Sequence, residues 1–216
     1  FMHKMEAAAS QLTAFVNNIL NVSRIEANQM SMQLHEEKWE ATLRNACEDA
    51  AMRARVHGIE FEYKITPDLP NVAVDRISIY EVINNLLENA IKYSPNTKKI
   101  IIESHLDDQG NVETTVQDFG LGIPNNVLPN LFDKFYRNHR TKTEVGGTGL
   151  GLFLCKSIID AHGGQIWAKS KEGEGSTFGF TLVPYAKLAD ELKTGDNADI
   201  TRTAHGWIKN HSLYRR

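Results

Sequence analysis

The chain has 216 residues, of which 41% are apolar, which is typical of a globular protein with a packed core and excludes a chain of low complexity. Its 24 basic and 27 acidic residues give a formal charge of −3, which excludes a general attraction to nucleic acid or an anionic membrane. Cys47 and Cys155 are far apart in sequence, which excludes a disulfide framework and a zinc-ligand spacing and favours a reducing compartment.

The first predicted element is an amphipathic helix over residues 1–32. Its apolar residues recur every three or four positions, at Leu12, Phe15, Val16, Ile19, Leu20, Val22 and Ile25. The length of this stripe indicates packing against helices outside this protomer or outside this stretch of chain, with an ordinary core helix as the alternative. No apolar run approaches the ~20 residues of a membrane span. Because Phe1 is neither an initiator methionine nor the start of a signal peptide, we expect a soluble piece of a longer protein.

The next part of the chain predicts alternating strands and helices. The predicted elements are a strand at 32–37, a helix at 39–57 ended by Gly58, a strand at 59–65, a turn at 67–70 and a strand at 72–74. Asp75 is a good N-cap, because a short carboxylate can accept a hydrogen bond from a free backbone N–H at a helix start. The helix after it should run to Ser94 and stop at Pro95.

Two predicted hairpins complete the domain. The first pairs strands 99–106 and 112–118, the second pairs strands 165–170 and 177–183, and a helix at 149–162 lies between the hairpins. These elements predict an α/β fold, a two-layer sandwich whose mixed, mostly antiparallel sheet is covered by helices and preceded by the long amphipathic helix. The polar segment 133–145 is the longest candidate for a mobile loop.

The stretch NNLLENAIKYS carries asparagines inside a predicted helix, although asparagine is a poor helix former. On a helical wheel the apolar residues face the core, and Asn85, Glu88, Asn89 and Lys92 form one polar stripe with Tyr93 at its edge. Amide and carboxylate oxygens suit a hard cation such as Mg²⁺, and the lysine would meet phosphate directly. The alternative is an ordinary solvated helix face.

Asp118 ends a predicted strand on the side of its apolar valines and is followed by Gly120 and Gly122 in DFGLGIP. A carboxylate that accepts a hydrogen bond from an exocyclic amine, beside glycines that allow close backbone approach, would make an adenine pocket. The alternative is that the aspartate only shapes a turn.

The segment GGTGLGL, at 146–152, leads straight into an apolar helix. Free backbone N–H groups at a helix N-terminus bind phosphate, although no Walker A pattern occurs and a flexible hinge is the alternative. Just upstream, Phe132 and Phe135 precede a polar loop with Arg137, Arg140 and Lys142, which we interpret as a lid over a triphosphate.

In order and spacing, NLLENAIKYS, DFGLGIP, LFDKFYR and GGTGLGL resemble the N, G1, F and G2 boxes of the catalytic ATP-binding domain of sensor histidine kinases. That domain belongs to a superfamily shared with gyrase, mismatch-repair ATPases and a heat-shock chaperone, and has the Bergerat-type ATP-binding fold. The resemblance implies ATP and Mg²⁺ as cofactors.

Carried over by position, the resemblance also implies roles for single residues. Asn89 would bind Mg²⁺ with Asn85 beside it. Lys92 and Tyr93 would meet the phosphates. Asp118 would hold the adenine amine in a pocket shaped by Gly120 and Gly122. The remaining implied nucleotide contacts are Arg137, near the γ-phosphate, and Gly147, Thr148, Gly149, Leu150 and Gly151, along the phosphates.

The implied domains are residues 1–32, the second helix of a dimerisation and phosphoacceptor hairpin; 33–185, the catalytic ATP-binding domain; and 186–216, an extension of unknown role. The first helix of the hairpin, with its phosphorylated histidine, has no counterpart in this sequence. The resemblance implies dimerisation through the hairpin in the full-length protein and a monomer for this piece. It also implies a cytoplasmic location, as part of a membrane-anchored sensor.

The expected reaction is transfer of the ATP γ-phosphoryl group to a histidine, for relay to an aspartate on a response-regulator receiver domain. Catalysis would rest on Asn85 and Glu88, with Glu88 polarising the acceptor histidine. Hydrolytic relatives carry a glutamate base four residues before the metal asparagine, and the amide of Asn85 cannot accept that proton, which favours transfer. A hydrolytic ATPase of the same superfamily and a nucleotide-binding pseudokinase remain the alternatives, and no nucleic-acid partner is expected.

Overall fold

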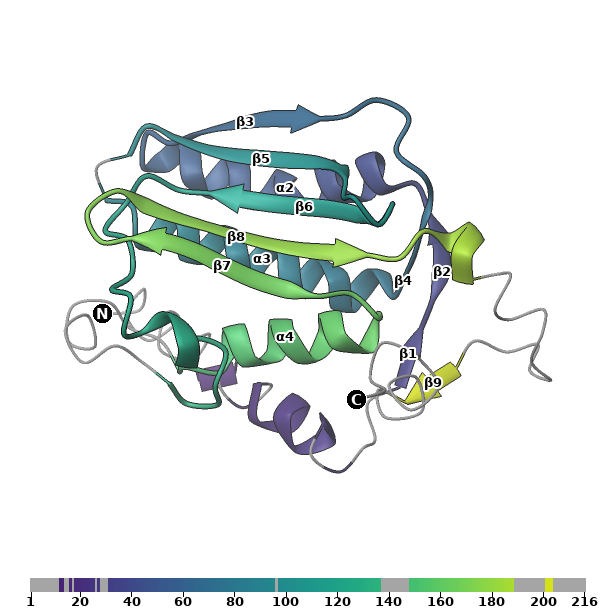
Figure 1. Cartoon of the computed structure of the whole chain (residues 1–216). Helices are drawn as coiled ribbons and strands as arrows, with labels where there is room; N and C mark the ends of the chain where they lie inside the picture. Colours follow the sequence, from purple (N-terminus) through teal and green to yellow (C-terminus); the bar gives the residue numbers. More distant parts are fainter. Residues whose placement is uncertain are drawn as a thin grey trace.

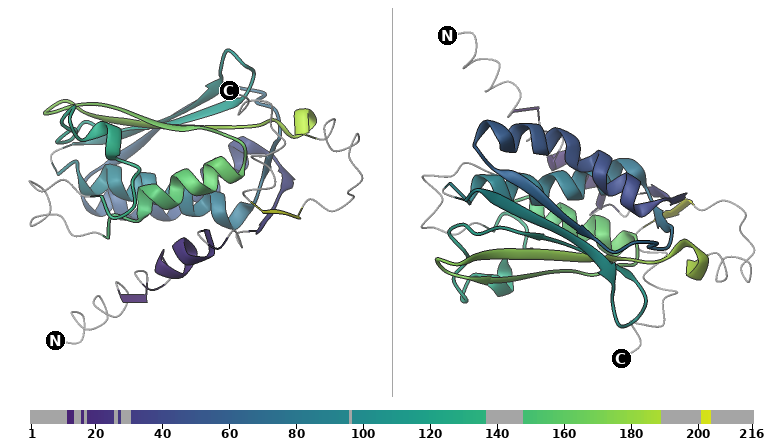
Figure 2. Two further views of the ribbon diagram at one scale, coloured as in Figure 1. Left: turned by 60° about the horizontal axis from the view of Figure 1, so that its bottom comes forward. Right: turned by 90° about the horizontal axis from the view of Figure 1, so that it is seen from above.

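The computed structural model describes residues 31–95, 97–136, 148–188 and 201–203, together with residues 12, 13, 16, 18–25 and 27 of the first helix. The main strands are β3 (Glu60–Ile65), β5 (Lys99–Leu106), β6 (Val112–Gln117), β7 (Ile166–Lys171) and β8 (Gly175–Leu182). The helices that pack on them are α2 (Trp39–Val56), α3 (Arg76–Lys92) and α4 (Gly151–Ala161). Figures 1 and 2 show the strands as one layer and these helices as the other.

The five strands form one mixed sheet with the order β3-β5-β6-β8-β7. β3 pairs with β5 in parallel, and the remaining neighbours pair antiparallel. The predicted α/β sandwich with a mostly antiparallel sheet is therefore confirmed. Both predicted hairpins, β5–β6 and β7–β8, are present.

Shorter elements lie at the edge of this sandwich. β1 (Ser31–Gln33) pairs with β9 (Thr201–Thr203), β2 (His35–Glu37) pairs with β4 (Val72–Val74), and a 3₁₀ turn, η1, covers Leu128–Asn130. The sequence predicted one strand at 32–37, but the structure has two, separated at Leu34, whose side chain is buried.

The core lies between the helices and the inner face of the sheet. Trp39 of α2 packs edge-on against Phe180 of β8, with ring centroids 6.0 Å apart. Its indole N–H lies 3.0 Å from Ser104 Oγ and 2.9 Å from Thr114 Oγ1, so the buried polar atom of the ring has partners. Alternation along the strands places Ser104 and Thr114 on this inner face and their sequence neighbours on the outer one.

The prediction for α3 is accurate at the start of the helix and two residues too long at its end. Asp75 caps the helix, since the Ser78 N–H donates to its Oδ1 at 3.0 Å. The helix ends at Lys92, because Ser94 turns away to donate its hydroxyl to Asp118 Oδ1 at 3.1 Å. β6 likewise ends before Asp118, whose carboxylate accepts from the Gly120 N–H of the following turn.

The first helix is helical at its described positions between residues 12 and 25 and lies beside α4 (Figure 1). Val22 is buried and Ile25 packs against the core. Four other apolar side chains of the predicted stripe, those of Leu12, Val16, Ile19 and Leu20, are 42–64% exposed. Within the described part of the chain, therefore, other residues cover only the C-terminal end of this apolar stripe. Among the described helices, none combines the length and hydropathy that a membrane crossing requires.

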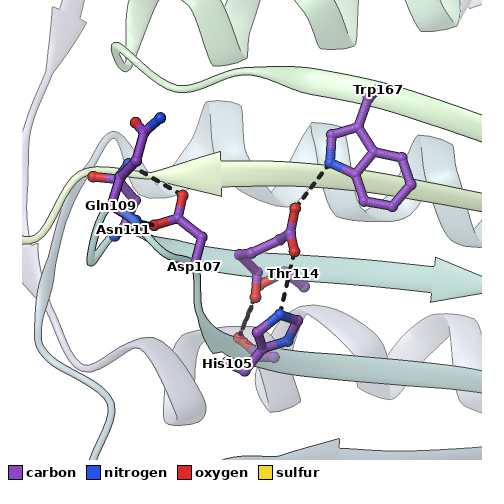
Figure 3. A network of polar contacts seen from close by, with 8 residues as sticks. His105, Asp107, Gln109, Asn111, Thr114 and Trp167 are labelled. Atoms are coloured by element: carbon purple, nitrogen blue, oxygen red, sulfur yellow. Dashed lines mark hydrogen bonds and ion pairs between the residues drawn. The ribbon is translucent and has the colours of Figure 1, made fainter.

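The outer face of the sheet carries a polar network (Figure 3). The Trp167 indole N–H donates to Glu113 Oε1 at 3.0 Å, and His105 Nε2 lies 3.2 Å from Glu113 Oε2. Asp107 closes the β5–β6 turn by accepting from the backbone N–H groups of Gln109 and Asn111 (Figure 3). A hollow of about 440 Å³ lies here and is lined by Glu103, His105, Glu113, Thr115, Gln117, Trp167, Lys169 and Thr177. It is on the face away from the helices, and none of the predicted site residues lines it.

Candidate functional site

Asp118 lies at the end of β6 with only 4% of its surface exposed. Its Oδ1 accepts from the Gly120 N–H at 2.9 Å, the Ser94 hydroxyl at 3.1 Å and the Ser176 N–H at 3.3 Å. Its Oδ2 has no hydrogen-bond partner among the described residues. Burial raises the pKa of Asp118, and the three hydrogen bonds partly offset that effect. The carboxylate is thus held by one oxygen and offers the other to an amine donor.

The glycines after Asp118 pack the loop against the protein itself. A Cβ at Gly120 would overlap the carbonyl oxygen of Tyr93. Gly122 has φ +65°, and a Cβ there would overlap the carbonyl oxygen of Lys171. The Leu121 N–H donates to the Tyr93 carbonyl at 3.0 Å. At these glycines the loop backbone therefore lies close to the end of α3 and to β7. This packing fixes the loop beside Asp118.

The start of α4 carries backbone N–H groups that have no capping side chain among the described residues. Its N-cap residue, Leu150, makes no side-chain capping hydrogen bond, and the first hydrogen bond of the helix runs from the Leu154 N–H to the Leu150 carbonyl. Leu150 is fully buried and anchors the end, while Gly149 has φ +72° and accepts at its carbonyl from the Phe135 N–H at 3.0 Å. The Thr148 hydroxyl accepts from the Leu150 N–H at 3.2 Å. An uncapped helix N-terminus of this kind favours an anion.

Asn85 brings α3 against this helix start. A Cβ at Gly151 would lie 2.7 Å from Asn85 Oδ1, so the absence of a side chain at Gly151 lets the two helices meet. The Asn85 Nδ2 group donates to the Glu81 carbonyl at 2.9 Å, which fixes the orientation of the amide. Asn89 follows one turn later, half-buried, and its side-chain amide has no hydrogen-bond partner among the described residues.

The rest of the predicted stripe spreads to either side. Lys92 is exposed, and its Nζ lies 5.4 Å from the centroid of the Tyr93 ring. Glu88 lies toward α2, where its Oε1 accepts from Arg53 Nη2 at 3.4 Å with 62% of the side chain exposed. The structure thus brings Asn85 against Gly151 and places Asp118 next to Ser94, just after the end of α3. It leaves Glu88 on the side of that helix that faces α2.

Two predicted site residues, Arg137 and Gly147, lie outside the described residues, as does most of the predicted lid. Two partners of Asp118 were missed in the sequence. Ser94 could have been suspected, because it directly follows the helix and precedes Pro95. Ser176 comes from β8, 58 residues away in the chain, and no local pattern could have identified it.

A metal site must be judged from the chemistry of its donors. No group of three or more His, Cys, Asp or Glu side chains is arranged for a metal in the described part of the chain. Asn89 can supply an amide oxygen, which suits a hard cation such as Mg²⁺ that keeps waters and takes its remaining ligands from phosphate oxygens. The residues present therefore fit Mg²⁺ carried in by a nucleotide rather than a metal held by protein groups alone.

Residues 74–186 match the family described as histidine kinase-, DNA gyrase B-, and HSP90-like ATPase. Adaptive-response sensory kinase SasA of Synechococcus sp. (strain JA-3-3Ab) is 35% identical over 175 residues, which are 81% of this chain and 46% of that protein. Sensor histidine kinase WalK of Bacillus subtilis (strain 168) is 31% identical over 195 residues, 88% of this chain and 31% of that protein. The chain thus spans less than half the length of these curated relatives.

Solved structures show the same fold. Full-length ShkA in complex with AMPPNP superposes with a TM-score of 0.72 at 25% identity, over 82% of this chain and 36% of that one. The nucleotide-free catalytic domain of histidine kinase ThkA superposes with a TM-score of 0.60 at 32% identity, over 70% of this chain and 96% of that one.

Proposed function

The chain belongs to the family of histidine kinase-, DNA gyrase B- and HSP90-like ATPases, and on this basis we propose that it is the catalytic region of a sensor histidine kinase. In this proposal it binds Mg·ATP and transfers the γ-phosphoryl group to a histidine, for relay to an aspartate of a response-regulator receiver domain. The relatives named sensor kinases and the likeness to a histidine kinase bound to AMPPNP support it.

One observation carries the proposal: Asp118 Oδ2, which has no hydrogen-bond partner among the described residues, the amides of Asn85 and Asn89, and the start of α4 all lie around the second half of α3. We assign the adenine amine to Asp118, in a pocket held by Gly120 and Gly122. We assign Mg²⁺ to Asn89, with Asn85 beside it. The phosphates would lie at the start of α4, along Gly147, Thr148, Gly149, Leu150 and Gly151, with Lys92, Tyr93 and Arg137 as further contacts.

In the proposed step, an imidazole nitrogen of the acceptor attacks the γ-phosphorus as the bond to the bridging β–γ oxygen breaks, and ADP leaves. The protein contributes mainly positioning and charge neutralisation. Mg²⁺, when bound with ATP, neutralises phosphate charge. Asn85 is fixed by its bond to the Glu81 carbonyl and, as an amide, cannot act as a base on water, which favours transfer over hydrolysis. Glu88 is exposed and would polarise the acceptor histidine from outside the domain.

The expected domain division also becomes a proposal. Residues 1–32 would form the second helix of the dimerisation hairpin, and the exposed apolar side chains of Leu12, Val16 and Leu20 suit such a contact. Residues 33–185 would form the catalytic domain, working in the cytoplasm where ATP is available. The extension from 186 contributes Leu188 to the core and β9 to a pairing with β1.

The test is incubation of the chain with ATP labelled at the γ-phosphate, Mg²⁺ and the helical hairpin of the full-length protein. Acid-labile label on the hairpin is the expected result. Steady release of phosphate without the hairpin would identify a hydrolytic ATPase instead, and nucleotide binding without either product would identify a pseudokinase.

The metal assignment has its own test on α3. Asn89→Ala should weaken the binding of Mg·ATP, while Asn84→Ala, a change of the same residue type on the same helix, should not. Asn84 is a suitable control because its Oδ1 is buried without a hydrogen-bond partner among the described residues. If the Asn89 variant keeps its affinity for Mg·ATP, the assignment is wrong.

A further inference from the structure

Asp75, at the start of α3, is hydrogen-bonded to three separate parts of the fold. Its Oδ1 accepts from the Ser78 N–H at 3.0 Å and so caps the helix. Its Oδ2 accepts from the Gln33 N–H of β1, also at 3.0 Å. Its own backbone N–H donates to Nε2 of His162, at the end of α4, at 2.9 Å. One residue thus joins the strand that follows the first helix to both helices of the candidate site.

His162 is held in one tautomer by its surroundings. Only 1% of its surface is exposed, and its Nδ1 lies 2.7 Å from the Ile158 carbonyl oxygen. A carbonyl oxygen can only accept, so Nδ1 carries the hydrogen and Nε2 offers its lone pair to the Asp75 N–H. Burial lowers the pKa of His162, which favours this neutral form. The ring is therefore a fixed spacer between the end of α4 and the start of α3.

The same two helices meet again at the nucleotide end. Asp75 and His162 are in contact at one end and Asn85 and Gly151 at the other, so α3 and α4 run in opposite directions. Between these points Cys155 Sγ lies 3.9 Å from the Val82 carbonyl. At about 1.5 Å per residue, each helix spans roughly 15 Å between the two contacts. Because helices of this length are stiff, the far contact sets how Asn85 faces the start of α4.

β1 is held firmly enough to act on this contact. Met32 and Leu34, on either side of Gln33, are 2% and 4% exposed and belong to the core. The Gln33 N–H is therefore fixed at Asp75 Oδ2, and a displacement of β1 breaks that hydrogen bond.

We propose that Asp75 and His162 are positioning residues that transmit the position of β1 to the nucleotide site. With Gln33 bound, the junction of Asp75 and His162 keeps α3 and α4 in the arrangement that accepts Mg·ATP. When β1 moves, Asp75 loses a partner and the start of α4 shifts relative to Asn85. This inference rests on the proposed function and adds a route by which a displacement of β1 reaches the nucleotide site.

Two variants cut the connection to β1. Gln33→Pro removes the backbone N–H that Asp75 accepts from, since proline has none, and it also fixes φ at this position. Asp75→Asn keeps one oxygen and remains a good N-cap, but the –NH₂ group that replaces Oδ2 is a donor and cannot accept from the Gln33 N–H. Each change should weaken Mg·ATP binding about five-fold or more, within the usual range of coupling between sites. Both changes remove the same contact. The double variant should therefore bind Mg·ATP no more weakly than whichever single variant has the lower affinity.

Two substitutions test the role of His162: one removes the acceptor of the Asp75 N–H, and the other supplies a new acceptor. His162→Ala removes the acceptor of the Asp75 N–H and should weaken Mg·ATP binding by a similar factor. His162→Gln supplies an amide oxygen that can accept from the same N–H, and it should recover at least part of the affinity. Lys156→Ala, an exposed change on α4, is the control and should bind as the unmodified chain does. Affinities come from calorimetry, and melting curves show that each variant is folded.

Hydrogen exchange adds a readout that needs no nucleotide. The first amides of α4 should exchange faster in Gln33→Pro, although that change lies at the opposite end of the helix pair. If Gln33→Pro and His162→Ala melt at lower temperatures but bind Mg·ATP as tightly as the unmodified chain, the junction is only structural and the inference is wrong. If the unmodified chain itself does not bind Mg·ATP, the proposed function fails and this inference fails with it.

Discussion

The two oxygens of Asp118 differ in their surroundings, and in the proposed function this difference would give the site a preference between purine bases. Among the described residues, three donors bond to Oδ1 and none to Oδ2, so Oδ2 is the oxygen that the proposal leaves for a ligand. The exocyclic amine of adenine can donate to it, whereas the carbonyl of guanine at the same position can only accept.

Asp118→Asn should therefore weaken ATP binding and reduce the preference for ATP over GTP. The lost contact is a hydrogen bond to a charged acceptor, worth about 1.5–3 kcal/mol, or roughly 10- to 150-fold in Kd. The new amide can keep its oxygen toward Ser94 and donate to the guanine carbonyl. Calorimetry with both nucleotides measures the ratio. An unchanged ratio between ATP and GTP would show that Asp118 does not bind the base.

His162 predicts an acid-sensitive stability. Burial lowers its folded-state pKa below the ordinary value of 6.5, while the facing charge, the Asp75 carboxylate, acts in the opposite direction. The unfolded chain therefore binds a proton at a pH where the folded chain does not, and the free energy of unfolding falls as the pH drops below about 6.5, by at most about 1.4 kcal/mol per pH unit. Urea denaturation of the unmodified chain and of His162→Gln at pH 7.5 and 5.5 measures the difference. Equal pH slopes for the two proteins would contradict the prediction.

At the scale of an element, a substitution at the start of α4 should have opposite effects on the stability of the helix and on its packing against α3. Gly151→Ala should make the helix itself more stable, because alanine is favoured over glycine in a helix by about 0.5–1 kcal/mol. The added Cβ would lie 2.7 Å from Asn85 Oδ1 and should push α3 and α4 apart at the nucleotide end. We expect a melting temperature close to that of the unmodified chain and a Kd for Mg·ATP that is raised about ten-fold, equivalent to about 1.4 kcal/mol.

Ser157→Ala is the control for this change, because Ser157 lies in the same helix and, among the described residues, its hydroxyl bonds only to the Phe153 carbonyl. It should leave the affinity for Mg·ATP unchanged. If Gly151→Ala binds Mg·ATP normally, the start of α4 does not meet the phosphates.

The outer face of β8 depends on a glycine under a large ring. A Cβ at Gly179 would overlap the indole of Trp167, so Gly179→Ala should displace the ring and break its hydrogen bond to Glu113 (Figure 3). Overpacking of this kind costs about 1–3 kcal/mol. Chemical denaturation should show the loss, and the tryptophan emission should shift as the indole becomes more exposed. Because this face lies away from α3 and α4, the affinity for Mg·ATP should remain unchanged.

At the scale of the whole molecule, Mg·ATP should stabilise the fold, since its binding residues come together only when the α and β layers are packed. A ligand at 100 times its Kd adds about 2.7 kcal/mol to the free energy of unfolding. For a domain of this size that corresponds to roughly 5–10 °C in Tm. Thermal melting with ATP, with and without Mg²⁺, measures the effect. A shift that is the same after chelation of Mg²⁺ would contradict the proposed metal site.

The sequence by itself determined most of the elements of this protein. The helix start at Asp75, the strands 72–74 and 99–106, and the order of the four motifs were all readable, because caps, alternation and glycine signals depend on residues that are close in the chain. Boundaries were wrong where a distant partner intervened, as at Ser94, which leaves α3 to hold Asp118.

The tertiary structure alone decided which of these residues meet. It paired β3 with β5 in parallel, placed Asn85 against Gly151 and Ser176 against Asp118, and joined Asp75 to His162 and Gln33. Local periodicity describes which face of an element is apolar, but not which other element covers it. That choice is made by packing and hydrogen bonding between residues far apart in the chain, and the candidate site exists only through those contacts.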